Sequence, residues 1–286
     1  MPTTQPPPNP STLHLTGIDR DAGGASDQRA RAAQAWIIRW DRQQERFLPE
    51  REAQFTALVD AVEEVSGRPD PLVVDLGCGP GCLSIRVLDR LPGSAVVAID
   101  ADPILLELGR RAFAHIPGLR FVDADLRHSD WADRLALPRR ADAVVSTTAL
   151  HWLEPAALTH VYARARALLR PDGVLLNGDE MERDRSTSPV LSRLDRALVT
   201  REQRRRSTDV AAEEWHTWWR EVTADPDLAD AVAERDRRGY DGQHHVDLSS
   251  SFQLHLDALR AAGFGEVGPI WQRGENRLMC AVNAAG

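Results

Sequence analysis

The sequence lacks any apolar run that approaches the roughly 20 residues a membrane-spanning helix needs. Its first residues have neither a basic start nor an apolar centre, so they do not predict a secretory signal. Only three cysteines occur among 286 residues, an odd number too small for a disulfide framework, and this fits a reducing compartment. We therefore expect a cytoplasmic protein without a membrane partner.

The sequence also lacks an excess of positive charge. Its formal net charge is −8 at pH 7, and the resulting field would repel a phosphate backbone. A basic run at residues 201–206 is the exception, and such runs are usually solvated helix faces. The composition, with 42% hydrophobic and 27% charged residues, is typical of a soluble globular protein. A small-molecule substrate is expected and a nucleic-acid partner is not, while a monomer and a homodimer are both compatible with the sequence.

Composition and periodicity divide the chain into five segments. The first is rich in Pro, Gly, Ser and Thr, and burial cannot offset the entropy of ordering it because it has almost no apolar periodicity. The second has apolar residues at three- and four-residue steps on both sides of Pro49, which predicts two helices. The predicted segments are a disordered tail (1–28), an N-terminal helical cap (29–68), an α/β core (69–179), a helical insertion that serves as a substrate lid (180–247), and a C-terminal helix with the last two strands of the core (248–286).

Short apolar runs alternate with amphipathic helical stretches in the core, as a parallel sheet with helices on both faces requires. The predicted strands are Leu72–Leu76, Ala95–Ile99, Arg120–Val122, Ala143–Ser146, Gly173–Asn177, Val267–Trp271 and Leu278–Val282. Helices are predicted after Gly81 and over Pro103–His115, Pro155–Leu169 and Phe252–Ala262. The last two strands are joined by a short turn-rich segment, which indicates an antiparallel hairpin. The predicted fold class is doubly wound α/β.

The most informative motif is LVVDLGCGPGCLS, residues 72–84, in which a buried strand runs into a glycine loop (residues 77–81) that opens a helix. Glycine permits a tight turn and removes side chains where a ligand would touch the backbone. A dinucleotide fingerprint needs a third glycine three positions after the second, but Cys82 stands there. Asp75 at the strand end would repel a pyrophosphate and attract the ammonium and sulfonium of S-adenosylmethionine (SAM). The motif therefore favours SAM over a dinucleotide.

A second acid, Asp100, ends the next strand in VVAIDADP, residues 96–103. A carboxylate there can accept hydrogen bonds from a ribose diol, although NAD-binding proteins share this feature. Asp102 is expected to be the N-cap of the following helix.

A third acidic segment is FVDADLRHSDW, residues 121–131. Asp125 is a candidate acceptor for the exocyclic amine of adenine, with the backbone of Leu126 at the ring edge, and Asp123 is the alternative.

These segments carry a resemblance to a family. DLGCGPG, VVAIDAD, FVDADL, ADAVVSTTALHWL and LLRPDGVLLNGD resemble the successive motifs of class I SAM-dependent methyltransferases over about residues 70–180, and the resemblance resumes at LRAAGFGEVGPIWQRGENRLMCAV. ALHWL is most similar to small-molecule members of the trans-aconitate methyltransferase group. The resemblance implies a Rossmann-like, seven-stranded, mostly parallel sheet with an antiparallel last strand. It also implies SAM as cofactor, S-adenosylhomocysteine (SAH) as product and a small-molecule methyl acceptor.

The resemblance further implies which residues hold the cofactor. Thr147 stands where relatives often have Asn, and it would face the cofactor through its backbone. The implied contacts are the methionine moiety with Asp75, Gly77, Cys78 and Gly79, the ribose with Asp100 and Ala101, and the adenine with Asp125 and Leu126.

Methyl transfer is an in-line displacement that depends mainly on positioning, and a base is needed only if the acceptor arrives protonated. His151, which follows the fourth strand, is the candidate base; alternatively, His151 and Trp152 pack over the cofactor. A second aromatic group lies in the insertion, where the spacing of three and four residues puts the side chains on one helical face. These residues, Trp215, Trp218 and Trp219, would form either an acceptor wall or plain lid packing.

His245, next to His244, is a further candidate to line the substrate site, with a solvated loop as the alternative. No metal site is expected, because adjacent side chains diverge on most backbones. Cys78 and Cys82 lack the third cysteine of a radical SAM motif, since position 85 is Ile85. The remaining alternatives are a SAM-binding enzyme that does not transfer methyl groups, such as a cyclase, a pure binding module, and an NAD(P)-dependent oxidoreductase.

Overall fold

The computed structural model describes residues 24–48, 50–206, 214–240 and 251–284. Helix α1 (Ala25–Phe47) begins within the segment predicted to be a tail, so residues 25–28 are helical, and residues 1–23 lie outside the described part. Helix α2 (Arg51–Ser66) follows, which confirms two helices on either side of position 49. Within the described ranges, no helix has the length and apolarity needed to cross a membrane.

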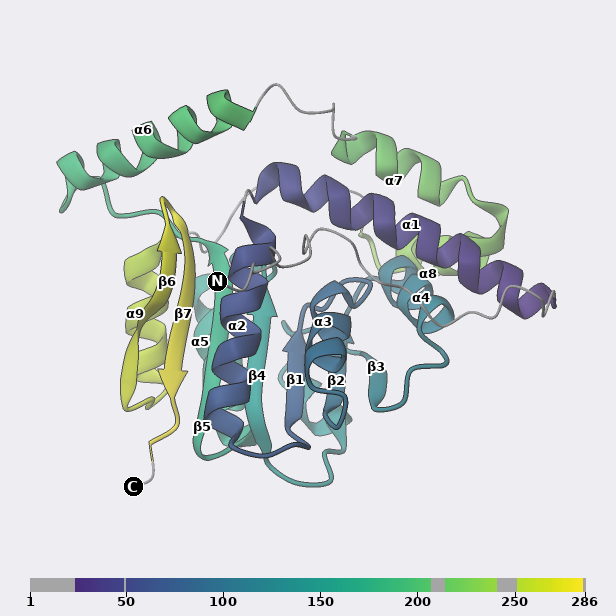
Figure 1. Cartoon of the computed structure of the whole chain (residues 1–286), viewed down its shortest axis with the longest axis horizontal. Helices are drawn as coiled ribbons and strands as arrows, with labels where there is room; N and C mark the ends of the chain where they lie inside the picture. The colour runs from purple at the N-terminus through teal and green to yellow at the C-terminus, as the bar shows by residue number, and fades with distance from the viewer. Residues whose placement is uncertain (1–23, 49, 207–213, 241–250, 285–286) are drawn as a thin grey trace, which may run out of the picture.

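Seven strands form one sheet in the order β3-β2-β1-β4-β5-β7-β6 (Figure 1). Strands β1 to β5 are parallel, and β7 is antiparallel to both of its neighbours. The strands are β1 (Leu72–Leu76), β2 (Ala95–Asp100), β3 (Leu119–Asp123), β4 (Ala141–Thr147), β5 (Leu169–Glu180), β6 (Glu266–Arg273) and β7 (Asn276–Val282). The predicted doubly wound fold is confirmed, and each predicted strand lies within an observed one.

Alternate strand residues bury themselves on opposite faces of the sheet, as the two-residue period of a strand requires. Val73 packs with residues of α2 and α3 on one face, while Val74 packs with residues of α5 and α9 on the other. The helices of the core are α3 (Cys82–Arg90), α4 (Pro103–Ala112), α5 (Pro155–Leu168) and α9 (Phe252–Ala261).

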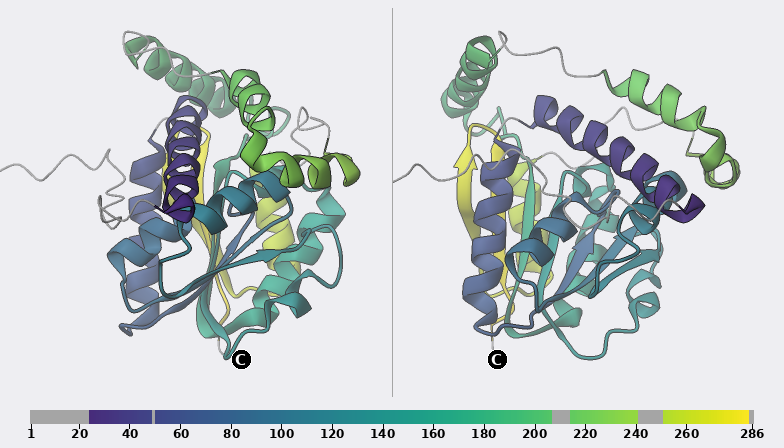
Figure 2. Two further views of the ribbon diagram at one scale, coloured as in Figure 1. Left: turned by 90° about the vertical axis from the view of Figure 1, so that its right-hand side faces the viewer. Right: turned by 45° about the vertical axis from the view of Figure 1, so that its right-hand side comes forward.

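Between β5 and α9 lie the helices α6 (Pro189–Arg206), α7 (Trp215–Thr223) and α8 (Ala229–Arg237), which confirms the predicted helical insertion. Helix α1 crosses the carboxyl ends of the strands, and α7 lies beside it (Figure 2). Buried apolar residues of α1, α4 and α7 form one cluster there. The cap and the insertion together therefore cover the edge of the sheet where ligands bind in folds of this type.

The register of the parallel strands brings their ends to one level. Leu76 of β1 pairs with Ile99 of β2 and with Ser146 of β4. Thr147 of β4 in turn pairs with Gly178 of β5. The residues that follow each strand therefore meet at the same edge, beneath α1.

Candidate functional site

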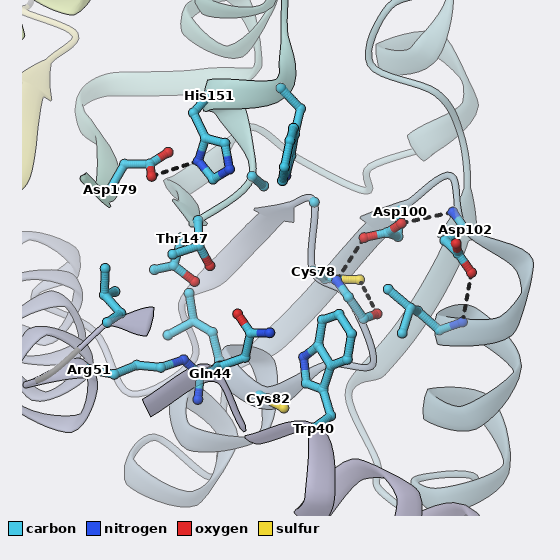
Figure 3. A pocket seen from close by; sticks show the side chains of 18 of the residues that line it. Trp40, Gln44, Arg51, Cys78, Cys82, Asp100, Asp102, Thr147, His151 and Asp179 are labelled. Atoms are coloured by element: carbon cyan, nitrogen blue, oxygen red, sulfur yellow. Dashed lines mark hydrogen bonds and ion pairs between the residues drawn. The ribbon is translucent and has the colours of Figure 1, made fainter. Parts of the chain in front are cut away.

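A cavity of about 500 Å³ lies at this edge (Figure 3). The glycine loop and the residues that end β2, β4 and β5 line one side, while α1, α2 and α7 line the other. Of the predicted site residues, the cavity brings together Gly77, Cys78, Gly79, Asp100, Thr147, His151, Trp152, Trp215 and Trp219.

Bare backbone faces the cavity at the glycine loop. Gly77 has a φ of 66°, and a Cβ on it would come within 2.3 Å of the Ala149 Cβ, so any side chain here would collide with the segment after β4. Gly79 has a φ of 56°, and the nearest atom to a Cβ built on it is Trp40 Nε1 at 3.9 Å. Both positions favour glycine because L-residues rarely adopt these angles.

Asp100 is tied to the glycine loop. Its Oδ2 accepts a hydrogen bond from the Gly79 amide at 2.7 Å, and its Oδ1 accepts from Ala101 and Asp102 at 2.7 and 2.8 Å. Desolvation raises the pKa of this carboxyl to about 6, so it is mostly ionised at neutral pH. A carboxylate has about four acceptor positions, which leaves Oδ2 able to accept one further hydrogen bond from a ligand.

Asp75 does not line the cavity, contrary to the prediction that it would contact the methionine moiety. It is buried beneath the glycine loop, where it accepts a hydrogen bond from Ser84 Oγ at 2.6 Å. Desolvation raises its pKa to about 7, so the carboxyl is only partly charged at neutral pH. Its observed contact joins β1 to the first turn of α3.

The predicted adenine residues Asp125 and Leu126, and Ala101, also do not line the cavity. Asp125 accepts hydrogen bonds from Arg127 and from the Tyr240 hydroxyl, the latter at 3.0 Å. Burial opposes ionisation of Asp125, but the Arg127 hydrogen bonds outweigh it and hold the pKa at about 2. An adenine amine at Asp125 would have to share the carboxylate with these two groups.

The alternative acceptor, Asp123, is occupied as well. Arg238, just after α8, donates to both of its carboxylate oxygens at 2.7 Å and to the Ala101 carbonyl at 3.0 Å. Arg235 of α8 donates to Asp102 Oδ2 at 2.7 Å. The insertion is therefore fastened to the ends of β2 and β3 by charge-assisted hydrogen bonds, which are stronger than neutral ones.

At the other end of the cavity, His151 and Asp179 form a pair. His151 Nδ1 lies 2.8 Å from Asp179 Oδ1, and Asp179 is 1% exposed. Which of these two atoms carries the proton depends on the tautomer of the ring. The His151 and Trp152 rings are 4.5 Å apart between centroids. Figure 3 shows this pair across the cavity from Asp100.

Backbone strain marks the segment that leads to His151. Thr148 has a φ of 50°, which is unusual for a β-branched residue, and its amide donates to the Gly178 carbonyl at 2.9 Å. Both Thr147 and Thr148 line the cavity. Strain of this kind clusters at functional sites, where the surrounding structure holds it.

The tryptophans of α7 have two different environments. Trp215 and Trp219 line the cavity with Trp40, whereas Trp218 is fully buried and does not. Trp218 Nε1 donates to the Trp36 carbonyl at 3.3 Å, and its ring lies 4.8 Å from that of Trp40. The prediction that Trp218 lines the substrate site is therefore wrong; Trp218 anchors α7 on α1. His245 lies outside the described residues, and His216 lines the cavity.

Sequence reasoning missed Gln44, Arg51 and Asp179. Arg51 forms a buried ion pair with Asp41, and its Nε and the Gln44 Nε2 are buried without a partner among the described residues. Both side chains line the cavity. Asp179 lies near the end of β5 in the segment LLNGD, and an acid at the end of a parallel strand is the signal that could have identified it. Among the described residues, no group of three or more His, Cys, Asp or Glu is placed to hold a metal ion.

Comparison with known proteins finds a methyltransferase domain and methyltransferase relatives. Residues 73–173 match the family described as Methyltransferase domain. A trans-aconitate 2-methyltransferase from Acidovorax sp. (strain JS42) is 32% identical over 117 residues, which are 41% of this chain and 41% of that protein. The chain therefore matches about two fifths of the length of this curated relative.

Solved structures share the fold at low identity. Human N-acetylserotonin methyltransferase in complex with SAM has a TM-score of 0.51 at 16% identity, over 91% of this chain and 57% of that one. An O-methyltransferase family protein from Burkholderia thailandensis has a TM-score of 0.51 at 19% identity, over 90% and 72% of the two chains. Residues 73–173 therefore match a methyltransferase domain, and they include the glycine loop and the strands β1 to β4 of the sheet.

Proposed function

We propose that this protein transfers the methyl group of SAM to a small-molecule acceptor. The observation that carries the proposal is a single cavity with the glycine loop and Asp100 at one end and the His151–Asp179 pair at the other. A cofactor and an acceptor bound in that cavity would meet beneath α1. Positioning of this kind can lower the barrier by roughly 7 to 11 kcal/mol in favourable model systems.

The charge of the lining supports a positively charged cofactor. Four acids and one arginine line the described cavity: Asp100, Asp102, Asp179, Glu180 and Arg51. A sulfonium is attracted by such a lining, and the pyrophosphate of a dinucleotide is repelled by it. The carboxyl of Asp75 does not contribute to this lining, because it is buried.

The residues present fit SAM. The backbone of Gly77 to Gly79 would accommodate the methionine moiety, and Asp100 would accept from one ribose hydroxyl. The side chains of Gln44 and Arg51, which line the cavity, would bind the methionine carboxylate. When bound, SAM supplies a methyl group activated by the positive charge of its sulfur.

The chain's own residues perform the remaining tasks. His151 Nε2 would accept a proton from the acceptor, and Asp179 beside Nδ1 would hold the ring in the tautomer that makes this possible. The α1 and α7 tryptophans would exclude water, so the segment 180–247 would act as a lid as predicted.

Cys78, Cys82 and Cys280 are unpaired thiols, and we propose a reducing, cytoplasmic location on that basis.

The test is to incubate the protein with SAM carrying a deuterated methyl group and with pools of small molecules. We expect SAH and an equal amount of labelled product by mass spectrometry. His151→Gln should reduce product formation, whereas Asp70→Asn, at the amino end of β1, should not. Binding of SAM without SAH formation across all pools would contradict methyl transfer and favour a non-methylating enzyme or a binding module.

A further inference from the structure

Given the proposed methyl transfer, we infer that the acceptor is an uncharged aromatic molecule methylated at a phenolic hydroxyl, and is not a polycarboxylate. Three features of the cavity carry this inference: the base, the charge of the lining and the aromatic wall beside the base.

A general base is useful only if the attacking group of the acceptor is protonated when it binds. A carboxylic acid, with a pKa near 4, is already ionised at pH 7, whereas a phenol, with a pKa near 10, is not. The structure nevertheless holds His151 at 2.8 Å from the buried carboxylate of Asp179, an arrangement suited to general-base chemistry. A phenolic hydroxyl would use this pair, and a carboxylate would not.

The charge of the lining opposes a polyanion. Asp179 and Glu180 both line the His151 end of the cavity. Arg51 is the one arginine in the described lining, its charge is already paired with Asp41, and the chain contains no lysine. A tricarboxylate such as trans-aconitate would bring three negative charges close to these acids, at a Coulombic cost of about 1 kcal/mol or more for each near pair. An uncharged acceptor avoids that cost.

The wall beside the base is aromatic. The Trp152 ring packs against the His151 ring at 4.5 Å and is itself part of the lining. Trp215 of α7 also lines the cavity, and the centroid of its ring lies 5.2 Å from that of the Trp40 ring. Such rings favour a flat aromatic ligand, because an aromatic pair contributes about 0.5 to 1.5 kcal/mol beyond the burial of area.

The reaction step balances. The phenol oxygen forms a bond to the methyl carbon, and the carbon–sulfur bond breaks with its electron pair remaining on sulfur. The phenol proton moves to His151 Nε2, from which it is later released to water. The products are an aryl methyl ether and SAH.

The test compares three uncharged phenols, catechol, 1-naphthol and 4-hydroxybiphenyl, with trans-aconitate, measuring kcat/KM from SAH release and identifying each product by mass. We expect at least one phenol to exceed trans-aconitate by tenfold or more, with the methyl group on oxygen. Preference for trans-aconitate would overturn the inference and leave methyl transfer intact. Absence of SAH with all three phenols would also overturn the inference, whereas methyl transfer itself is contradicted only if no pool of small molecules yields SAH.

His151→Gln separates a base from a packing role. At pH 7 the variant should lose about 100-fold or more in kcat for the preferred phenol. The loss should shrink near pH 10, where the phenol ionises unaided. Among the described residues, the titratable or charged groups that line the cavity with His151 are Asp100, Asp102, Asp179, Glu180, His216 and Arg51. A loss that is constant with pH would assign His151 to packing and overturn the inference.

Trp152→Leu tests the aromatic wall without turnover. Binding of 1-naphthol to the SAH-loaded protein should weaken about tenfold in Trp152→Leu, while SAH affinity should stay the same. Unchanged naphthol binding would contradict a role for this ring in holding the acceptor.

Discussion

Asp179 Oδ1 lies 2.8 Å from His151 Nδ1, and the carboxylate is sealed from solvent at the end of β5. Asp179→Asn would let the amide donate to Nδ1, so the proton would move to Nε2 and the base would be lost. We expect kcat to fall on the order of 100-fold with little change in SAM affinity. Steady-state kinetics with calorimetry checks this, and Asp257→Asn on the exposed face of α9 is the matched control. A change in KM alone would contradict the prediction.

Gly77→Ala should be far more harmful than alanine at another glycine of positive φ. The new Cβ would come within 2.3 Å of the Ala149 Cβ, whereas a Cβ on Gly67, at a φ of 58°, would meet nothing within 4 Å. We expect about 1 to 2 kcal/mol of destabilisation for Gly67→Ala from the backbone alone. Gly77→Ala should add about 1 to 3 kcal/mol from overpacking and weaken SAM binding. Urea unfolding and calorimetry measure both, and equal effects at the two sites would refute this packing.

Asp75→Asn should change the pH dependence of stability. The pKa of Asp75 is raised to about 7 in the folded protein, above the unfolded value near 3.9. The folded state therefore holds the proton more tightly, so the free energy of unfolding falls as the pH rises from about 4 to 7, on the order of 4 kcal/mol in total. Asparagine can still accept from Ser84 and does not titrate. The variant should gain stability relative to the parent at pH 8 but little at pH 4.5, and a pH-independent difference between the two would contradict this.

Trp218→Ala should release α7 from α1. The side chain is fully buried among Trp36, Trp40 and α4, and removing a buried tryptophan costs about 3 to 5 kcal/mol. We expect faster hydrogen exchange in α7 and weaker SAM binding. Trp219→Ala, on the half-buried cavity side of the same helix, should leave the exchange of α7 nearly unchanged. The same exchange in both variants would argue against Trp218 as the anchor.

Most of the fold could be predicted because its elements have clear periodic patterns. The strand Leu72–Leu76 was predicted with its observed bounds, since a continuous apolar run between a proline and a glycine loop has few other interpretations. β5 extends from Leu169 to Glu180, beyond the predicted Gly173–Asn177, because Leu169 pairs with Ala141 of β4 and the residues Gly178 to Glu180 pair with β7.

The site residues that could be predicted are those at the carboxyl ends of the strands. Gly77 follows β1, Asp100 ends β2 and His151 comes after β4, and the register of the parallel strands brings these positions to one edge of the sheet. Gln44 and Arg51 could not be found in this way, because they reach the cavity only when α1 and α2 dock across the sheet.

Whether Asp125 is available to adenine could not be decided from the sequence, because its partners in the fold are not all local. Tyr240 and Arg127 share Asp125, and Tyr240 comes from a segment more than 100 residues away along the chain. Local motifs do not encode a partner that far away, so the contact of Asp125 with adenine stays a prediction.

The most direct test of the account is calorimetry of SAH and NADH binding to the protein and to Asp100→Ala. We predict saturable SAH binding at one site, no detectable NADH binding, and a loss of about 1.5 to 3 kcal/mol in Asp100→Ala, roughly 10- to 150-fold in Kd. Tight binding of NADH with no binding of SAH would contradict the assignment of this cavity to a sulfonium cofactor.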